Sequence, residues 1–363
     1  MIELSLHGWH QDMGATFAAV NGMEVVDHYG DPIVEHTALR ESAGVLDLSL
    51  RGRLCLTGAD RVRLLNGQVT NDVKMLSVGM GCYAAVVTAK GKMESDANIY
   101  CLPDELLLDF EPGLTTKLTQ RFDKYIIADD VQAVDVAPLY GLLSLQGPKS
   151  AGVIQALDLN FTVPSRLMEF SSVKDESHGE IYCVNHSRAR ALGFDLFVPT
   201  AALAEVAGKL VAGAANAGGR ACGWRALEWA RIEAGIPRFG ADMDETNLVP
   251  EAGIERQAIS YTKGCYIGQE VIARLRTYGQ VSKALRGLRL EKDLKGLPVG
   301  GDRLWQGDKE IGYVTSSIFS PTLKTNIALG YVRRECNEVG TRLTLRTAAD
   351  ESSAEIVPIP FTD

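Results

Sequence analysis

The feature that most constrains the fold of this chain is a change near residue 284 in the pattern of apolar and turn-forming residues. Beyond it, short apolar segments are separated by turn sequences such as Gly300-Gly301 and Ser320-Pro321. The expected strands are Ala284–Leu290, Arg303–Gln306, Glu310–Thr315, Ile327–Val332, Arg342–Arg346 and Ala354–Ile359. Short strands with regular turns are typical of antiparallel barrels and sandwiches. We therefore expect residues 281–363 to form a separate β domain that carries no chemistry of its own.

Upstream of residue 281, strands and helices are mixed. Within residues 51–134 the expected strands are Arg53–Leu56, Tyr83–Thr88, Ala97–Leu102, Leu106–Phe110 and Val131–Val136, with helices after Gly58 and over Leu114–Tyr125. Strand and helix order of this kind indicates an α+β layer with an antiparallel sheet. The expected fold class is α+β. Its domains are a discontinuous one (1–50 with 135–280), an inserted one (51–134) and the C-terminal one (281–363).

The first 50 residues read as a helix, a short loop and a second helix. Asp12 is a candidate cap for an alanine-rich helical turn over Ala15–Val20. Asp31, followed by proline, opens the second helix, because proline is favoured at the first helical position. His36 and Arg40 fall one turn apart on that helix and share a face. The simplest interpretation of this pair is a solvated polar face.

Charge and cysteine usage exclude several classes of protein. The net charge of −9 argues against a broad electrostatic grip on nucleic acid or on an anionic membrane. The seven cysteines are scattered and form no Cys-x-x-Cys pair, which indicates neither a disulfide framework nor a structural zinc site. No lysine or arginine precedes Arg40, and no apolar run approaches the roughly 18 residues of a membrane span. We expect a cytoplasmic protein without a bound metal, and we expect no contact with nucleic acid or membrane.

The segment Lys-Gly-Cys-Tyr-Ile-Gly-Gln-Glu at residues 263–270 departs most from generic globular sequence. Its two glycines frame Cys265 and allow another backbone or a ligand to approach closely. Lys263 lies two residues before Cys265, and a nearby ammonium favours the thiolate, the reactive form of cysteine. The segment therefore predicts a functional thiol. The alternative is a small buried hydrophobic residue, which is what most intracellular cysteines are.

A second candidate lies at the turn after Gly91. If the next segment is a strand, Glu94 and Asp96 point to the same face, because side chains alternate along a strand. A carboxylate there could accept hydrogen bonds from a ligand's N–H groups, and a solvated turn carboxylate is the alternative. Two other patterns are rejected. The Gly-x-Gly-x-x-Ala match at residues 79–84 precedes a strand, and the acidic loop at 242–253 lacks the glycine and the glutamate of a calcium loop.

Several segments together resemble one family, the aminomethyltransferase (glycine-cleavage T-protein) superfamily. They are Glu35-His36-x-x-x-Arg40, Val45-Leu46-Asp47-Leu48-Ser49, Gln146-Gly147-Pro148, Arg231-Ile232-Glu233-Ala234-Gly235, Gly312-Tyr313-Val314-Thr315-Ser316, Ser320-Pro321 and Ile327-Ala328-Leu329-Gly330. Their order agrees with the family over almost the whole chain. Within the superfamily, the segment at 263–270 resembles the signature of the YgfZ-type folate-binding proteins.

This resemblance implies a folate-binding fold with a central channel, followed by a C-terminal antiparallel β-barrel. It implies tetrahydrofolate as the ligand. Asp96 resembles the T-protein carboxylate beside the pterin and its reacting nitrogens, and Glu233 resembles the carboxylate that binds the pterin ring. For Glu233, a helix-end salt bridge is the alternative. Tyr83 and Arg231 complete the expected folate-binding set, and Cys265 resembles the YgfZ-type cysteine.

Two functions follow from the resemblance. The first is a tetrahydrofolate-binding protein that supports the assembly or repair of iron–sulfur clusters, including those of tRNA-modifying enzymes, with Cys265 as its functional thiol. Its expected partners are folate and iron–sulfur client proteins. The second is an enzyme, a tetrahydrofolate-dependent aminomethyltransferase or related methyltransferase that uses Asp96. Cys265 favours the first function, and Asp96 is compatible with both.

Overall fold

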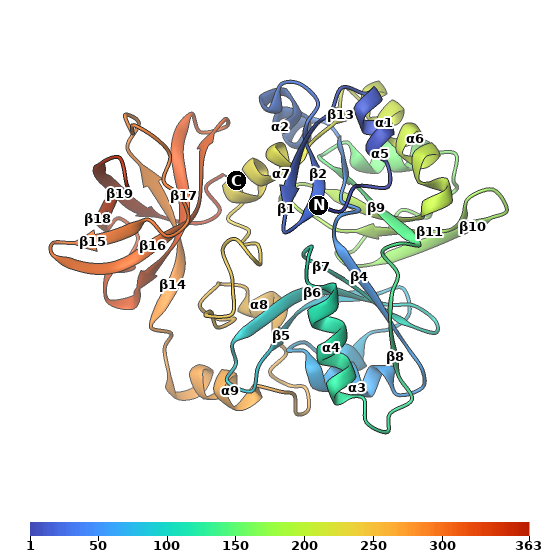
Figure 1. Ribbon diagram of the computed structural model, residues 1–363, viewed down its shortest axis with the longest axis horizontal. Helices are drawn as coiled ribbons and strands as arrows, with labels where there is room; N and C mark the ends of the chain where they lie inside the picture. The colour runs from blue at the N-terminus through green and yellow to red at the C-terminus, as the bar shows by residue number, and fades with distance from the viewer. Residues whose placement is uncertain (363) are drawn as a thin grey trace. The chain divides into compact units, whose positions relative to one another are not determined.

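The computed structural model describes residues 1–362, apart from the side chains of Asp175 and Tyr278. The chain forms two compact units (Figure 1). The first comprises residues 1–67, 72–84 and 97–228, and the second comprises residues 68–71, 85–96 and the chain from 229 onward. Within the described residues, no helix is both long and apolar enough to cross a membrane. The three-domain division expected from the sequence stays a prediction.

A six-stranded sheet forms the core of the first unit, in the order β10-β11-β12-β9-β3-β13. The strands are β3 (Gly44–Asp47), β9 (Tyr140–Gln146), β10 (Phe170–Asp175), β11 (Gly179–Asn185), β12 (Gly193–Pro199) and β13 (Arg220–Ala221). Neighbouring strands are antiparallel except for the pair β3 and β13. Helices α5 (Ser150–Ala156) and α6 (Leu203–Asn216) cover one face. The sequence analysis did not predict β10 and β11.

The apolar residues of that sheet and its helices explain the packing. Leu143, Leu145 and Leu196 belong to the same buried cluster as Val206 and Leu210 of α6. The two α6 residues are four apart and therefore share one helix face. The burial of a side chain of this size contributes about 1.5–3 kcal/mol. The helix is thus held on the sheet by its apolar stripe.

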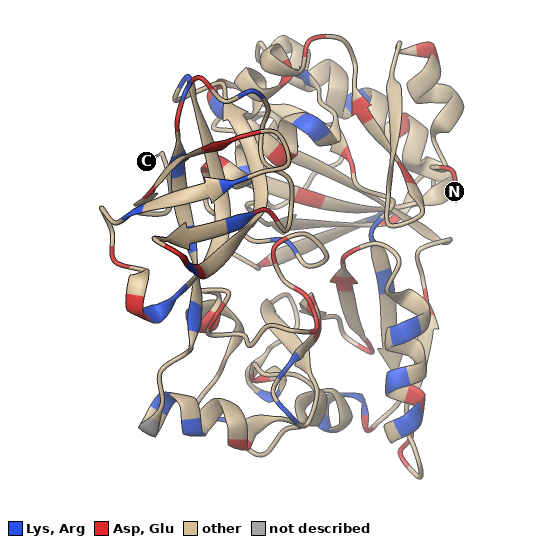
Figure 2. Cartoon of the chain, turned by 60° about the vertical axis from the view of Figure 1, so that its left-hand side comes forward, with Lys and Arg blue, Asp and Glu red and all other residues tan. Residues whose placement is uncertain are grey.

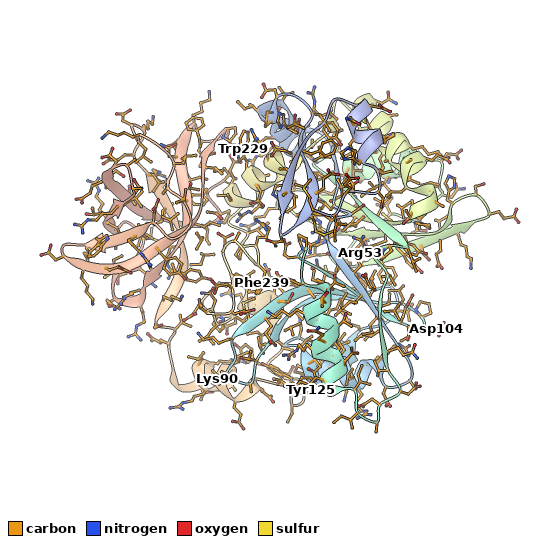
Figure 3. The ribbon with its side chains drawn as sticks, in the orientation of Figure 1. Arg53, Lys90, Asp104, Tyr125, Trp229 and Phe239 are labelled. Atoms are coloured by element: carbon orange, nitrogen blue, oxygen red, sulfur yellow. The ribbon has the colours of Figure 1, made fainter. Side chains whose placement is uncertain are left out.

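The five-stranded sheet has the order β5-β6-β7-β4-β8. Its strands are β4 (Gly52–Thr57), β5 (Gly81–Val87), β6 (Met93–Cys101), β7 (Leu106–Phe110) and β8 (Gln132–Asp135). The helices between them are α3 (Arg61–Gln68) and α4 (Thr115–Tyr125), the latter banded with blue cations in Figure 2. Each strand expected from the sequence in this region is present, and a strand does follow the Gly-x-Gly-x-x-Ala match. The side chains of Arg53 on β4 and Tyr125 on α4 are labelled in Figure 3.

The first 50 residues correct two expectations. Helix α1 (His7–Asp12) precedes a hairpin of β1 (Thr16–Val20) and β2 (Met23–His28), so the expected helical turn over Ala15–Val20 is wrong. Cross-strand pairing with β2 outweighs the helical preference of alanine there. Helix α2 (Pro32–Glu41) is confirmed, and the Asp31 side chain accepts a hydrogen bond from the backbone N–H of Ile33. His36 is only 2% exposed, so the expected solvated face is wrong as well.

The C-terminal part of the second unit is a closed antiparallel barrel of six strands in the order β14-β17-β16-β15-β18-β19, which confirms the expected fold. The strands are β14 (Lys283–Leu290), β15 (Arg303–Gln306), β16 (Lys309–Ser320), β17 (Thr325–Arg333), β18 (Arg342–Arg346) and β19 (Glu351–Val357). Alternate residues such as Leu288, Val314 and Leu345 fill its interior. Helices α7 (Trp224–Glu233), α8 (Glu255–Ala258) and α9 (Gln269–Tyr278) precede the barrel.

Candidate functional site

Strand β6 presents the two candidate carboxylates as the sequence predicts. Glu94 and Asp96 are half-exposed, whereas Met93 and Ser95 are fully buried. The alternation follows from the two-residue period of a strand. Both carboxylates therefore share one face of β6, within reach of solvent and of a ligand that approaches that face.

The octapeptide loop is anchored by its lysine. The side chain of Lys263 is buried, and its Nζ donates hydrogen bonds to the backbone oxygens of Val69 at 2.8 Å and Asn71 at 2.6 Å. The same ammonium lies 5.0 Å from the ring centroid of Tyr266, a favourable cation–π distance. The sequence predicts an effect of Lys263 on Cys265. In the structure, the ammonium fixes the loop to residues 69–71, and its effect on the thiol of Cys265 stays a prediction.

A glycine of the octapeptide is required by packing. Gly268 has φ +84°, and a Cβ at this position would stand 2.5 Å from the carbonyl oxygen of Thr88. Any other residue would therefore collide with the turn that leads into β6. Gly91 belongs to the same turn as Thr88. It has φ +72° and lies against Val271 of α9. The loop and the start of α9 are thus packed on the turn that precedes Asp96.

Cys265 is exposed, unlike the other cysteines of the chain. Cys55, Cys183 and Cys222 are buried, and their burial raises the pKa of each thiol. Burial also raises the pKa of the half-exposed Cys101. The alternative of a small buried residue therefore does not hold for Cys265, and its role as a functional thiol stays a prediction.

Glu233, the last residue of α7, is fully buried and bonded to the barrel. Its carboxylate accepts hydrogen bonds from the hydroxyl of Ser320, from the backbone N–H of Thr322 at 3.2 Å and from the hydroxyl of Thr322 at 2.9 Å. A carboxylate offers about four acceptor positions, and these contacts use three. Its backbone oxygen also accepts a bond from the N–H of Phe361 at 2.9 Å. The contact of Glu233 with a pterin stays a prediction.

Arg231 is also buried and ties α7 to strand β16. Its guanidinium forms an ion pair with Asp242 and donates to the hydroxyl of Ser316 at 3.0 Å. Thr315 donates to the other oxygen of Asp242 at 2.6 Å. The acidic loop that resembles a calcium site thus contributes Asp242 to an ion pair. A role of Arg231 in folate binding stays a prediction.

The expected site residues fall into separate groups. Arg231 and Glu233 hold the end of α7 to the barrel, whereas Asp96 lies on β6 beyond the turn that carries the Cys265 loop. Tyr83 is a half-exposed residue of β5 in the first unit. The assembly of these groups into one folate pocket stays a prediction.

A buried charge cluster in the first unit was missed by the sequence analysis. Arg188 contacts Asp195 at 2.6 Å and Asp109 at 3.2 Å, and Asp109 also accepts from Arg51 at 2.6 Å. His186 completes the group at 2.9 Å from Asp195. Burial opposes the ionisation of Asp195, but Arg188 and His186 outweigh it and hold the pKa of this carboxyl well below its usual range.

The pKa of the Asp109 carboxyl is also lowered. Its burial opposes ionisation, and the guanidinium groups of Arg51 and Arg188 prevail. One signal in the sequence could have found both residues. Asp109 follows Leu-Leu-Leu and Asp195 stands between two apolar residues, and a charge inside an apolar strand is retained only when it is paired. Strongly perturbed pKa values occur at functional sites and in structural ion networks alike.

Glu35 on α2 has a structural role that the sequence did not reveal. Glu35 is buried at 1% exposure and accepts hydrogen bonds from the backbone N–H groups of Tyr29 and Gly223, the latter at 2.7 Å. It therefore joins α2 to the segment before it and to the residue that precedes α7. Burial raises the pKa of the Glu35 carboxyl, and these two bonds oppose the rise.

Comparison with known families gives two matches that together span nearly the whole chain. The GCVT N-terminal domain family matches residues 6–263, and the glycine cleavage T-protein C-terminal barrel domain matches residues 283–363. The first match alone covers more than half of the chain.

Individual relatives agree with this result. An aminomethyltransferase of Symbiobacterium thermophilum is 29% identical over 364 residues, covering 98% of this chain and 96% of the relative. A probable aminomethyltransferase of Natronomonas pharaonis is 31% identical over 360 residues, covering 97% and 96%. The crystal structure of glycine cleavage system aminomethyltransferase T from Bartonella henselae superposes with a TM-score of 0.89 at 21% identity, covering 99% and 98%, which shows a shared fold. The finer resemblance to YgfZ-type proteins stays a prediction. The chain belongs to the glycine cleavage T-protein (aminomethyltransferase) family.

Proposed function

We propose that this protein is a tetrahydrofolate-dependent aminomethyltransferase, and that Asp96 is the carboxylate that meets the folate. The observation that carries the proposal is the half-exposed position of Asp96 on the accessible face of β6, in a chain that both T-protein family models match. This reading replaces the iron–sulfur function as the favoured one, since the named relatives are aminomethyltransferases.

The chemistry suits this residue. A reduced pterin presents N–H groups along its edge, and an ionised carboxylate binds such donors through charge-assisted hydrogen bonds. In the proposed reaction, the carbon of an aminomethyl group on a lipoyl carrier passes to two nitrogens of tetrahydrofolate as a methylene bridge. Its C–N bond breaks to release ammonia, and its C–S bond breaks to return the thiol of the carrier. Asp96 would orient the reacting nitrogens of the folate, and a positioned reactant removes part of the entropic barrier.

A second candidate function rests on Cys265. Lys263 and Gly268 have structural roles in the octapeptide, whereas Cys265 is exposed on the same loop. An exposed thiol on an anchored loop suits a redox, sulfur or cluster-contacting step, as in the YgfZ-type reading. Both functions include folate binding. They differ in whether the protein catalyses aminomethyl transfer to the folate.

Binding of tetrahydrofolate tests the assignment of Asp96. Calorimetric titration under anaerobic conditions should show binding to the wild-type chain and a loss of about 1.5–3 kcal/mol in Asp96→Asn, the contribution of a hydrogen bond to a charged group. Glu94→Gln is the matched control, because Glu94 lies two residues away on the same face of β6. Equal affinity of the wild type and Asp96→Asn would remove Asp96 from the site.

A further inference from the structure

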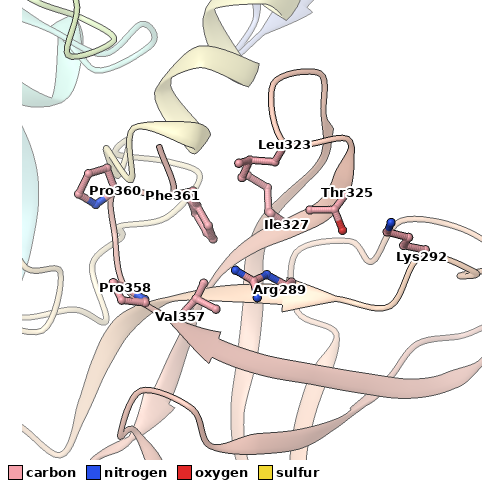
Figure 4. Close-up of a pocket in the computed structure, with 9 residues that line it drawn as sticks. All are labelled: Arg289, Lys292, Leu323, Thr325, Ile327, Val357, Pro358, Pro360 and Phe361. Carbon is pink, nitrogen blue, oxygen red and sulfur yellow. The ribbon is translucent and has the colours of Figure 1, made fainter. Parts of the chain in front are cut away.

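A pocket lies on the outer face of the barrel. The residues that line it come from a different part of the chain than β6 and the octapeptide loop. Its volume is about 450 Å³, within the size range of small-molecule sites. Strands β14, β17 and β19, the loop after β16 and the segment after β19 form its walls (Figure 4). The lining residues are Arg289, Lys292, Leu323, Thr325, Ile327, Val357, Pro358, Pro360 and Phe361.

One part of this pocket is apolar and well packed. Ile327 and Val357 are 1% and 7% exposed. Phe361 packs beside Ile327 in the apolar cluster that covers the barrel's outer face. Leu323 stands across from Phe361 at the rim (Figure 4). Such a surface would accept a planar ring or another apolar body.

The other part is cationic. Arg289 lies centrally in the pocket and Lys292 at its far side (Figure 4). Within residues 1–362, the charged groups of these two side chains take part in no hydrogen bond or ion pair. Glu355 is paired in register with Arg289 on β19 but forms no ion pair with it, and no acidic residue lines the pocket in the described chain. Two cations without a counter-charge favour an anionic occupant.

Both sides of the pocket are held by Glu233. On one side, its carboxylate accepts the two bonds from Thr322, next to Leu323. On the other side, its backbone oxygen accepts the N–H of Phe361. Because the walls are fixed in advance, a ligand would lose little binding free energy to ordering them.

We propose that this pocket binds a small organic anion that combines an apolar or aromatic body with one oxyanion group, either a carboxylate or a phosphate monoester. The oxyanion pairs with Arg289, and Lys292 adds positive charge at the far side of the pocket. The apolar body rests on Leu323 and Phe361, since Ile327 and Val357 are themselves almost fully buried. The site is separate from the folate contact assigned to Asp96, so it goes beyond the proposed aminomethyl transfer.

Calorimetric titration of the full chain tests this site with three probes. Phenyl phosphate and benzoate represent the two oxyanion classes, and inorganic phosphate represents the charge alone. At least one aromatic anion should bind, and inorganic phosphate should bind at least about tenfold more weakly, because it leaves the apolar surface uncovered. Tighter binding of benzoate assigns the carboxylate class, and tighter binding of phenyl phosphate assigns the phosphate class.

Charge-removing variants locate the binding. The double variant Arg289→Gln with Lys292→Gln should bind the aromatic anion about tenfold or more weakly than the wild type does, as expected for the loss of hydrogen bonds to charged groups. Arg333→Gln is the matched control, since it removes an exposed arginine from the same barrel at a second basic pocket formed with Lys283 and Arg334. Three results would overturn the proposal: an equal loss of affinity in Arg333→Gln, unchanged binding in the double variant, or no detectable binding of either aromatic anion to the wild-type chain.

Discussion

The hydroxyl of Thr322 donates a hydrogen bond of 2.9 Å to the carboxylate of Glu233. These residues lie 89 positions apart in the chain, one at the end of α7 and the other in the loop after β16. The bond fixes that loop to the helix. Any ligand role of Glu233 must therefore be separated from its role in holding the barrel.

Glu233→Ala separates these roles when it is compared with Thr322→Val. If Glu233 meets the folate, Glu233→Ala should weaken tetrahydrofolate binding by about 1.5–3 kcal/mol, because a charge-assisted bond is lost. Thr322→Val loosens the same loop and leaves the carboxylate in place, so its affinity for folate should stay near that of the wild type. Parallel losses of affinity in both variants would assign Glu233 to structure alone.

The charge cluster around Asp195 should make stability depend on pH. Because the pKa of Asp195 is lowered on folding, its contribution is fully present above the unfolded pKa of about 3.9 and is lost as the pH falls below that value. Asp195→Asn should cost about 3–5 kcal/mol at pH 7, because it removes the closer of the two carboxylates that pair with the largely buried Arg188.

Urea denaturation at pH 7 and pH 3 measures this effect. The difference between wild type and Asp195→Asn should narrow at pH 3, because Asp195 of the unfolded wild-type chain binds a proton at that pH while the folded carboxylate, with its lowered pKa, does not. Asp123→Asn, at an exposed position of α4, should change stability by no more than about 0.5 kcal/mol. A constant difference between the two pH values would contradict the account of Asp195.

Cys265 should be the first cysteine to react with iodoacetamide at neutral pH. It is exposed, whereas burial raises the pKa values of the Cys55, Cys183 and Cys222 thiols and keeps them protonated. Peptide mass spectrometry over a time course gives the order of labelling. Labelling of Cys265 after Cys183 would place it in a protected position and remove the basis for a functional thiol.

Two changes in the octapeptide should have opposite effects on stability. Cys265→Ala should leave the free energy of unfolding nearly unchanged, since an exposed side chain buries little area. Lys263→Met should cost about 1–3 kcal/mol, because the carbonyl oxygens of Val69 and Asn71 lose their donor. Denaturant titration of both variants checks this. A marginal cost for Lys263→Met would show that the loop is held by other contacts.

The sequence predicted those features whose causes are local. Asp31 and the proline after it specify the start of α2, and the alternation along β6 places Glu94 and Asp96 on one face. Glycine-punctuated short strands likewise indicated the barrel. In each case the signal and the structure lie within a few residues of each other.

Other features depended on partners far away in the chain. The carbonyl oxygens that hold Lys263 lie more than 190 residues before it. The acceptor role of Glu233 depends on Ser320 and Thr322. Pairing with β2 also made a strand of Thr16–Val20, contrary to the helical turn expected there. A single sequence does not show such pairings, so burial and ion pairing were the least predictable parts of the candidate site.

Single-turnover transfer tests the central claim most directly. The purified chain would be mixed with an aminomethylated lipoyl carrier protein and tetrahydrofolate, and both ammonia and methylene-tetrahydrofolate would be followed. We expect ammonia and methylene-tetrahydrofolate to form in equal amounts, and at the same rate in the wild type and in Cys265→Ala. The transfer rate should fall strongly in Asp96→Asn and change little in Glu94→Gln. Folate binding without ammonia release, together with a requirement for Cys265 in restoring iron–sulfur enzyme activity to cells that lack this protein, would contradict the transferase and favour the accessory function.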